Sequence, residues 1–217
     1  MSTRPEKRIG ADAVWDKAEK VLENVLKKKK MKYKINKGDG AFYGPKIDFH
    51  VKDSLGRTWQ LATIQLDFAM PERFDLKYTT EKNTLERPVM LHRVIYGALE
   101  RFIGILLEHT NGNLPLWLSP IQARVLSFTD RNVKAAEKFL QKLKEAGIRA
   151  DSDFNSTTVN DKVRTAELSK IPIMITIGDK EEEKGTIAVR ARGEKLKFNV
   201  APDNFIKELE EKIEKRE

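Results

Sequence analysis

The first part of the chain begins with a helical pattern of apolar residues. From Val14 onward they recur at three- and four-residue steps, which predicts an amphipathic helix with Asp12 as its N-cap. The helix is expected to end in the lysine run 27–30. Its predicted inward face consists of Val14, Trp15, Ala18, Val21, Leu22, Val25 and Leu26. This face must pack on another element.

An alternating pattern follows the break at Gly38–Gly40. Over 46–52, Ile47, Phe49 and Val51 fall on one side of a predicted strand, with Asp48 and His50 on the other. A second strand is predicted over 58–68, and the turn residues 53–56 join the two into an antiparallel hairpin. On the second strand Leu61, Thr63, Gln65 and Asp67 share one face, and Ala62, Ile64, Leu66 and Phe68 share the other.

A polar loop, an extended piece and a helix complete this first part. The loop covers 79–87, the extended piece 89–95 and the helix about 96–109. The inward residues of this helix are expected to be Leu99, Phe102, Ile103, Leu106 and Leu107.

The rhythm changes after the Asn-, Gly- and Pro-rich segment 110–120, where we place a domain boundary. Strands and helices then alternate, which is typical of a mostly parallel sheet with helices on its faces. The predicted strands cover 123–128, 148–154 and 171–178, the helices 133–146 and 159–169, a closing hairpin 186–200 and a final helix 204–216. The fold class is therefore α/β, with domains at 1–114 and 115–217.

Composition supports a packed protein of two domains and excludes several chemistries. The 217 residues are 40% hydrophobic and 34% charged, and cysteine is absent, which excludes disulfides, thiolate nucleophiles and sulfur ligands from this chain. No apolar stretch is long enough to span a membrane and the N-terminus lacks a signal-peptide core, so we expect a cytoplasmic protein. A net charge of +8 makes a polyanionic partner worth considering, although the lysine run is more often a solvated helix end.

Three features could carry chemistry, and each also has an ordinary structural explanation. Thr63, Gln65 and Asp67 face Lys46 and Asp48 across the predicted hairpin, which is chemically dense for a sheet surface but could be a plain solvent face. His92 follows an apolar run and could be a hydrogen-bonded core residue. Arg101 lies in an otherwise apolar helix and could pair with Glu100 or Asp67.

Long contiguous words extend over nearly the whole chain: STRPEK at 2–7, VWDKA at 14–18, GDGAFYGPKIDF at 38–49, TWQLATIQLDF at 58–68, PERF at 71–74, residues 87–109, and 115 to the final helix. Together these words resemble the C-terminal half of threonyl-tRNA synthetase, a class II aminoacyl-tRNA synthetase. The resemblance implies the distal part of an antiparallel catalytic sheet, followed by an α/β anticodon-binding domain. It places the third signature motif of the class at 97–102, with the first two motifs outside this chain.

The same resemblance implies roles for individual residues of the first domain. Arg101 and Lys46 are the expected catalytic residues, and Tyr43, Gln60, Thr63 and Gln65 are expected to line the pocket for threonine and Mg-ATP. A fixed guanidinium at Arg101 would stabilise charge that develops on the α-phosphate. His92 matches one of three zinc ligands that hold the amino and hydroxyl groups of threonine, so that valine is rejected. The other two ligands, a cysteine and a histidine, are expected upstream of this chain.

In the second domain the resemblance opens at 116–122 (LWLSPIQ) and implies contacts to the anticodon of tRNA(Thr). The residues that match by position are Arg164, Lys170, Glu181 and Arg190. Lys170 stands where the family usually has an arginine, so a bidentate contact there becomes a point charge.

These expectations favour one function and leave two alternatives open. The first is a C-terminal portion of a threonine–tRNA ligase that is inactive alone and works, when complete, as a homodimer. The second is a non-catalytic tRNA-binding or accessory protein that keeps the anticodon module. The third is a remnant that folds poorly, since a partial sheet exposes an edge and an apolar face.

Overall fold

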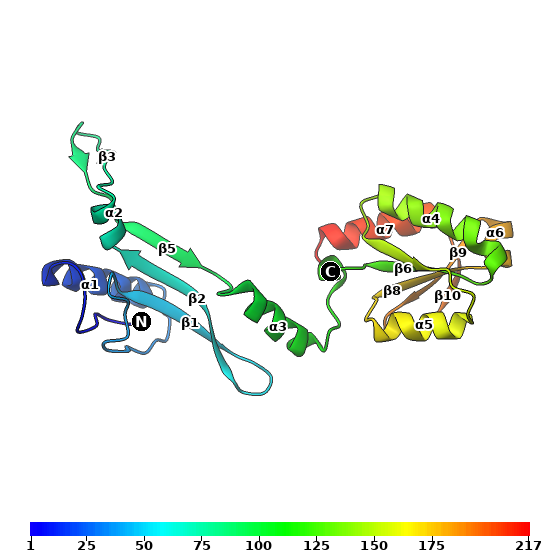
Figure 1. Ribbon diagram of the computed structural model, residues 1–217, viewed down its shortest axis with the longest axis horizontal. Coiled ribbons are helices and arrows are strands. Elements are labelled where there is room, and N and C mark those ends of the chain that lie inside the picture. The colour runs from blue at the N-terminus through cyan, green and yellow to red at the C-terminus, as the bar shows by residue number, and fades with distance from the viewer. The chain divides into compact units, whose positions relative to one another are not determined.

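The computed structural model describes all 217 residues and divides them into two compact units, Met1–His109 and Thr110–Glu217. The division falls five residues before the boundary expected at 114/115. Both units combine helices with sheets, antiparallel in the first and mixed in the second, which confirms the α/β fold class (Figure 1). No helix has both the length and the apolar character that a membrane span requires.

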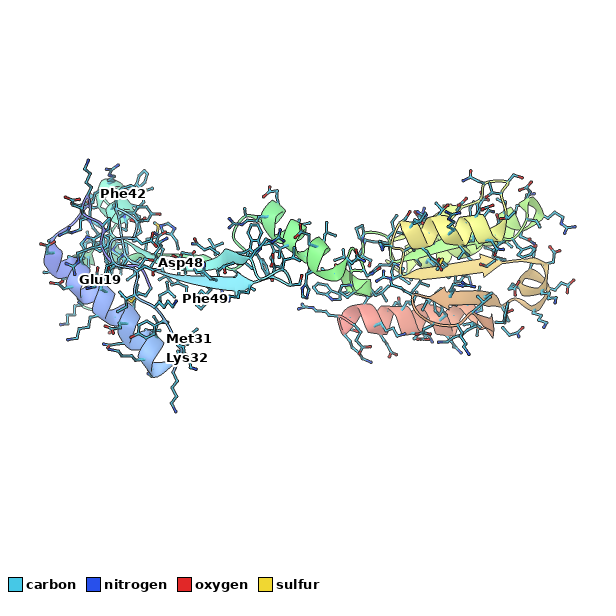
Figure 2. All side chains as sticks on the ribbon, turned by 90° about the horizontal axis from the view of Figure 1, so that it is seen from below. Glu19, Met31, Lys32, Phe42, Asp48 and Phe49 are labelled. Carbon is cyan, nitrogen blue, oxygen red and sulfur yellow. The ribbon has the colours of Figure 1, made fainter.

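The first unit is built on a three-stranded antiparallel sheet in the order β1-β2-β5. Its strands are β1 (Lys46–Lys52), β2 (Thr58–Asp67) and β5 (Met90–Val94), and α1 (Asp12–Lys28) lies along it. Leu22 and Leu26 of α1 pack with Ile47, against which Phe49 and Leu66 also lie. Figure 2 shows Phe49 on the side of α1 and Asp48 on the other side of the strand. One sheet face is thus covered and the other carries the polar side chains.

The remaining elements of this unit are short, apart from one helix. They are α2 (Ala69–Arg73), the two-stranded pair β3 (Tyr78–Thr79) and β4 (Leu85–Glu86), and α3 (Leu99–Thr110). The pair β3–β4 occupies the segment that was expected to be a plain loop.

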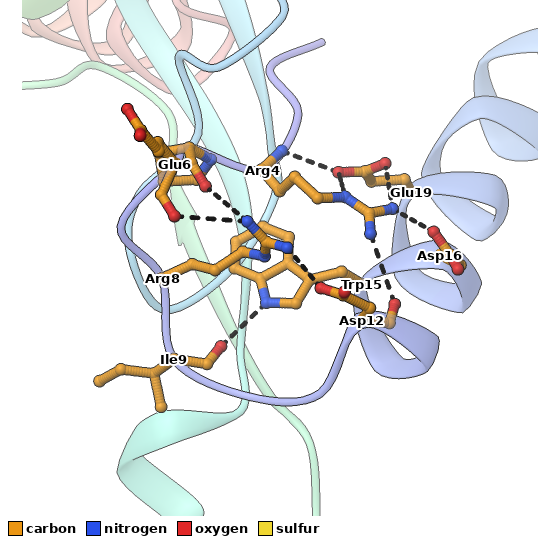
Figure 3. Close-up of polar contacts among 9 residues, drawn as sticks. Arg4, Glu6, Arg8, Ile9, Asp12, Trp15, Asp16 and Glu19 are labelled. Atoms are coloured by element: carbon orange, nitrogen blue, oxygen red, sulfur yellow. Dashed lines mark hydrogen bonds and ion pairs between the residues drawn. The ribbon is translucent and has the colours of Figure 1, made fainter.

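The segment before α1 is fixed by an indole and two arginines (Figure 3). The Trp15 ring is fully buried and donates from Nε1 to the Ile9 carbonyl at 2.8 Å. Arg4 pairs with Asp16 and, at 2.9 Å, with Glu19, while Arg8 pairs with Asp12. These contacts tie residues 4–9 to the first half of α1.

Three packing expectations for this unit are wrong. Asp12 is the first residue of α1 rather than its cap, because Ala11 holds the N-cap position and the Asp12 carboxylate pairs with Arg8 instead. Val14, Val21 and Val25 are 39%, 47% and 47% exposed, since only a narrow stripe of α1 contacts the sheet. A bulge between Phe49 and His50 interrupts the alternation, and Val51 is 49% exposed.

The helix α3 also differs from its expected packing. None of its residues is buried, and Leu99, Ile103 and Leu107 are 61%, 52% and 43% exposed. The apolar periodicity is real, but no element of the first unit covers this face. Periodicity shows which residues share a face of a helix, but not whether another element covers that face.

The second unit is a five-stranded mixed sheet in the order β10-β9-β8-β6-β7. The strands β6 (Ala123–Ser127), β7 (Ala150–Asp153) and β8 (Ile173–Ile177) are parallel, while β9 (Ile187–Ala191) and β10 (Lys197–Val200) extend the sheet antiparallel. This confirms the alternation pattern and the mostly parallel sheet.

Helices cover both faces of that sheet. In Figure 1, α4 (Val133–Glu145) and α7 (Pro202–Glu214) lie on one face and α5 (Val159–Leu168) on the other. A short helix, α6 (Asp179–Lys184), follows β8, and the single turns η1 (Leu116–Leu118) and η2 (Asp130–Asn132) flank β6. The core under α4 and α7 includes Val125, Phe139, Leu143, Ile175 and Leu209. The residues of this core all come from the second unit.

The turn between β1 and β2 is organised by one carboxylate. Asp53 Oδ1 accepts the backbone N–H of Leu55 at 3.0 Å and of Arg57 at 2.8 Å, and Oδ2 accepts the Trp59 indole N–H at 2.9 Å. The Trp59 hydrogen bond, aided by those from Arg57, lowers the pKa of Asp53 from 3.8 to about 2. All these donors favour the ionised form.

This depressed pKa predicts a pH dependence. The stabilisation from ionised Asp53 is complete above about pH 4 and is lost as pH falls toward 2, because the unfolded carboxyl group takes up its proton first. A carboxyl carbon-13 titration is expected to show Asp53 still largely ionised at pH 3. Half-protonation near pH 3.8 in the folded chain would contradict the hydrogen-bond assignment, and Asp53→Asn provides the peak assignment.

Candidate functional site

The strand register places three of the expected site residues in one row across the sheet. Gln65 of β2 is opposite Lys46 of β1 and opposite His92 of β5. Directly opposed residues project to the same face of an antiparallel sheet. Lys46, Gln65 and His92 are therefore neighbours on the polar face, and Thr63 lies opposite Asp48 in the next row.

Asp48 is the centre of a hydrogen-bond network on this face. Its Oδ2 pairs with Lys46 Nζ at 2.9 Å, and its Oδ1 accepts Gln60 Nε2 at 2.7 Å and Thr63 Oγ1 at 2.8 Å. The Asp48 side chain is only 6% exposed, so its charge depends on these partners. The network fixes the rotamers of Lys46, Gln60 and Thr63 before any ligand arrives.

A second network surrounds His92. Its Nε2 lies 2.8 Å from Oδ2 of Asp67, whose Oδ1 accepts the backbone N–H groups of Ala69 at 2.9 Å and Met70 at 3.0 Å. Burial raises the pKa of Asp67, but the hydrogen bonds from His92 and from these two amides outweigh it, and the pKa falls below its usual value. Tyr43 donates its hydroxyl to Gln65 Oε1 at 3.0 Å, and its ring meets the His92 ring edge-on with the centroids 6.3 Å apart.

Arg101 reaches the same face from α3. Its Nη2 donates to the backbone carbonyl of Gln60 at 2.8 Å, and it pairs with neither Glu100 nor Asp67, so the ion-pair alternative is wrong. A cavity of about 540 Å³ is lined by five of the expected residues, Lys46, Gln60, Thr63, Gln65 and Arg101. Tyr43 and His92 do not line this cavity and lie beside it in the second network.

His92 is the residue of this face that was expected to bind a metal. A carboxylate holding one ring nitrogen is the usual way in which a ligating histidine is oriented, and Asp67 holds His92 in this manner. However, no group of three or more His, Cys, Asp or Glu side chains that could hold a metal ion occurs in the structure. The residues of this chain therefore do not form a zinc centre by themselves.

Two close backbone contacts position the segment that carries Tyr43 and Lys46. A Cβ added at Gly44 would lie 1.7 Å from the Leu66 carbonyl oxygen, and one at Gly40 would lie 2.5 Å from the Thr3 carbonyl oxygen. Only glycine allows so close an approach. Gly44 thus brings residues 43–46 against β2, where the Leu66 N–H donates to the Pro45 carbonyl at 3.1 Å.

The second unit contains a separate cavity of about 440 Å³ at the carboxyl ends of its parallel strands. In this sheet β7 lies on one side of β6, and β8, the next strand in sequence, lies on the other side of β6. The strand order therefore reverses between β6 and β8, which is the switch point of the sheet. Ligands of open α/β sheets bind at such points. Phe128 follows β6 and Gly178 follows β8, and both line the cavity.

Two of the four expected anticodon residues line this cavity. Glu181 accepts the Gly178 N–H through Oε2 at 3.2 Å, and Arg190 has a long ion pair of 3.9 Å with Glu167. Arg164 and Lys170 do not line it. Arg164 is exposed on α5, and Lys170 has a φ of 60° just beyond the end of α5, where its carbonyl accepts Arg192 Nη2 at 2.8 Å.

Periodicity alone did not single out the aromatic residues of this cavity. Phe128 and Phe198 line it and are 55% and 62% exposed, so their rings are available to a planar ligand. Asn160, at the start of α5, adds an amide. The sequence could have indicated Phe128 as a site residue, because it ends a predicted parallel strand and ligands bind at such ends. Phe198 lies on a short edge strand whose facing is not determined by its sequence.

Comparison with known proteins finds a family match for each of the two parts of the chain. Residues 9–110 match the family described as the tRNA synthetase class II core domain (G, H, P, S and T), and residues 120–212 match the anticodon binding domain family. Threonine–tRNA ligase from Desulfatibacillum aliphaticivorans is 55% identical over 216 residues, which are all of this chain and 34% of the relative. The ligase from Desulforamulus reducens is 51% identical with the same coverage.

Solved structures of threonyl-tRNA synthetases also resemble this chain. The RNA binding domain of threonyl-tRNA synthetase from Cryptosporidium parvum aligns with a TM-score of 0.90 and 38% identity, covering 97% of this chain and 53% of that one. A putative threonyl-tRNA synthetase from Aeropyrum pernix aligns with a TM-score of 0.73 and 28% identity, covering 99% and 54%.

A partial antiparallel synthetase sheet joined in sequence to an anticodon-binding domain defines a class II aminoacyl-tRNA synthetase. Within that class, the chain belongs to the threonyl-tRNA synthetase family, as a C-terminal portion. It spans about a third of the length of the curated relatives it matches.

The glycine contact that positions Tyr43 and Lys46 can be tested by substitution. Gly44→Ala is expected to destabilise the chain by about 2–4 kcal/mol, because the methyl group cannot coexist with the Leu66 carbonyl. Urea unfolding measures this loss.

Gly104→Ala provides the matched control. A Cβ at Gly104 meets nothing within 4 Å, so alanine in this α3 position should be neutral or stabilise by up to ~1 kcal/mol. Equal stability of the Gly44→Ala variant and the parent chain would show that residues 43–46 are not held against β2.

Proposed function

We propose that this chain is the part of a threonine–tRNA ligase that completes the aminoacylation face and recognises the anticodon of tRNA(Thr). The observation that carries the proposal is 55% identity to a threonine–tRNA ligase over all of this chain. The polar sheet face and the switch-point cavity supply the two kinds of site that such an enzyme needs. The substrates of the complete enzyme are threonine, Mg-ATP and tRNA(Thr), and we expect it to be a homodimer and cytoplasmic.

The sheet face is suited to hold the reacting groups of ATP and threonine. Two cations, Lys46 and Arg101, share a cavity with the amide and hydroxyl groups of Gln60, Thr63 and Gln65. One Nη2 bond to the Gln60 carbonyl fixes Arg101, and a guanidinium has five N–H donors, so others remain for phosphate oxygens. Tyr43 and Asp48 keep Gln65, Gln60 and Thr63 in place through their hydrogen bonds.

The proposed chemistry has two steps. A carboxylate oxygen of threonine attacks the α-phosphorus of ATP and pyrophosphate leaves, giving threonyl-adenylate. A ribose hydroxyl of the tRNA then attacks the carbonyl carbon and AMP leaves. Arg101 would stabilise the negative charge that develops on the α-phosphate in the first step. Because no group of three or more metal-ligating side chains occurs in this chain, we assign no step to zinc and keep His92 as an expected ligand of a site that other residues must complete.

A chimera tests the ligase proposal. We expect that replacing the matching third of the Desulfatibacillum ligase with this chain yields threonine-dependent ATP–pyrophosphate exchange. Arg101→Ala in the chimera should lower kcat by roughly 10²–10³-fold, as does loss of one donor that stabilises a developing charge. The purified chain alone should show no exchange.

Two results would contradict this proposal. One is a folded chimera without exchange, which would favour the non-catalytic tRNA-binding protein. The other is full exchange activity of the Arg101→Ala chimera. The matched control is Arg131→Ala, which removes an exposed arginine of the second unit.

The switch-point cavity is suited to unpaired bases. Exposed Phe128 and Phe198 offer stacking surfaces, while Glu181 and Arg190 offer an acceptor and a forked donor for base edges. Arg164 and Lys170 lie outside the cavity, so in this proposal they contact the tRNA backbone beside it.

Binding of a tRNA(Thr) transcript tests this assignment. Phe198→Ala and Arg190→Ala should each weaken binding by about 5–100-fold, in keeping with roughly 1–3 kcal/mol per stacked base or bidentate contact. Lys207→Ala on α7 is the control and should change little. Unchanged affinity in both variants would show that the anticodon binds elsewhere.

A further inference from the structure

A dense group of lysines follows the end of α1, away from the polar sheet face. Residues 27–37 contain seven lysines and no acidic residue, which nearly equals the whole net charge of +8. We call these seven side chains the lysine patch. They are Lys27, Lys28, Lys29, Lys30, Lys32, Lys34 and Lys37. All seven are exposed, and Lys27 alone has an ion-pair partner, Glu23 at 2.8 Å.

Helix capping accounts for only part of the patch. Cations in the last turn of a helix are favourable because they face its free carbonyl groups, and this explains Lys27 and Lys28. The effect falls off beyond the last turn, so it does not explain Lys32, Lys34 or Lys37. Seven like charges within eleven residues repel one another, because screening at physiological salt acts only over roughly 8 Å. An external anion would relieve this repulsion.

The backbone that carries these lysines is held in place. Tyr33, the one half-buried residue of 27–37, packs on the cluster of Leu22 and Leu26, and its hydroxyl donates to Glu23 Oε1 at 2.9 Å. The Asn36 N–H donates to the Met1 carbonyl at 2.8 Å, and the Thr3 N–H donates to the Asn36 carbonyl at 3.1 Å. Figure 2 shows Met31 and Lys32 at the end of α1. The patch thus combines a backbone held by hydrogen bonds with exposed cationic side chains.

We propose that the lysine patch binds the phosphate backbone of RNA without sequence preference. This rests on the proposed function, because tRNA is the polyanion that the anticodon-binding unit would bring to the chain. Lysine is a point charge with three donors, which suits phosphates and carries no base preference. A membrane surface is less suited, because the exposed apolar neighbours Val25, Met31 and Ile35 are scattered and include no aromatic anchor.

The salt dependence of RNA binding gives the test. The variant K28Q/K32Q/K34Q/K37Q removes four unpaired charges and leaves the Lys27–Glu23 pair and the positive-φ residue Lys30 intact. The control K138Q/K144Q/K207Q/K215Q removes four charges from α4, α7 and the residue that follows α7. Binding of a tRNA(Thr) transcript to each full-length chain is measured between 50 and 200 mM salt, with melting temperatures to confirm folding.

We expect the patch variant to bind at least 10-fold more weakly at 50 mM salt. The slope of log K against log salt should fall by roughly 2–4, since each phosphate contact contributes about 0.9. The loss should be the same for a transcript with a changed anticodon. The proposal is overturned if the patch variant and the control variant have the same slope of log K against log salt. It is also overturned if the patch variant keeps its RNA binding and loses only its binding to vesicles of 30% phosphatidylserine.

The two proposals fail in different ways. If the anticodon proposal is wrong, Arg190→Ala and the changed anticodon have no effect, while the patch variant still lowers the salt slope. If the patch proposal is wrong, anticodon sensitivity remains and the slope of the patch variant matches the control.

Discussion

The register of the β1–β2–β5 sheet is the constraint on which the first site depends. A shift of one residue would turn every side chain of a strand to the opposite face. The register is fixed on one side by Ile47, Phe49 and Leu66, which pack with α1. On the other side the nearly buried carboxylate of Asp48 bonds to Gln60 and Thr63 of β2, and that of Asp67 bonds to His92 of β5, so both have cross-strand partners in this register. The same alignment that buries the apolar face therefore gathers Lys46, Gln65 and His92.

The candidate binding surfaces of the two units are formed in different physical ways. In the first, the surface is a sheet face whose polar groups hold one another in position before any ligand binds. In the second, the surface lies where parallel strands end and the chain changes direction between β6 and β8. There the backbone geometry creates the cavity, and exposed Phe128 and Phe198 give it its character. The lysine patch adds a third kind of surface, defined by charge density alone.

The sequence predicted the helices and strands better than it predicted burial and side-chain contacts. Alternation and helical periodicity located the main elements and the mixed sheet, because those patterns follow from backbone geometry. The exposure of α3 and of Val21 and Val25 was not predictable, since burial depends on which layers lie nearby. Tyr43 came from the resemblance alone, and only the resemblance made His92 an expected metal ligand. Their separation from the cavity of Lys46 and Arg101 depends on side-chain contacts. Phe198 lies on β10, a short edge strand, and its sequence does not show which face of the sheet the ring is on.

The sheet register is the claim that can be tested most directly. In a solution NMR spectrum of the labelled chain, cross-strand NOEs should connect Gln65 to both Lys46 and His92. That result would place the three polar residues in one row, as the account requires. NOEs from Gln65 to Ile47 or Leu91 as its directly opposed partners would indicate a slipped register and would contradict it.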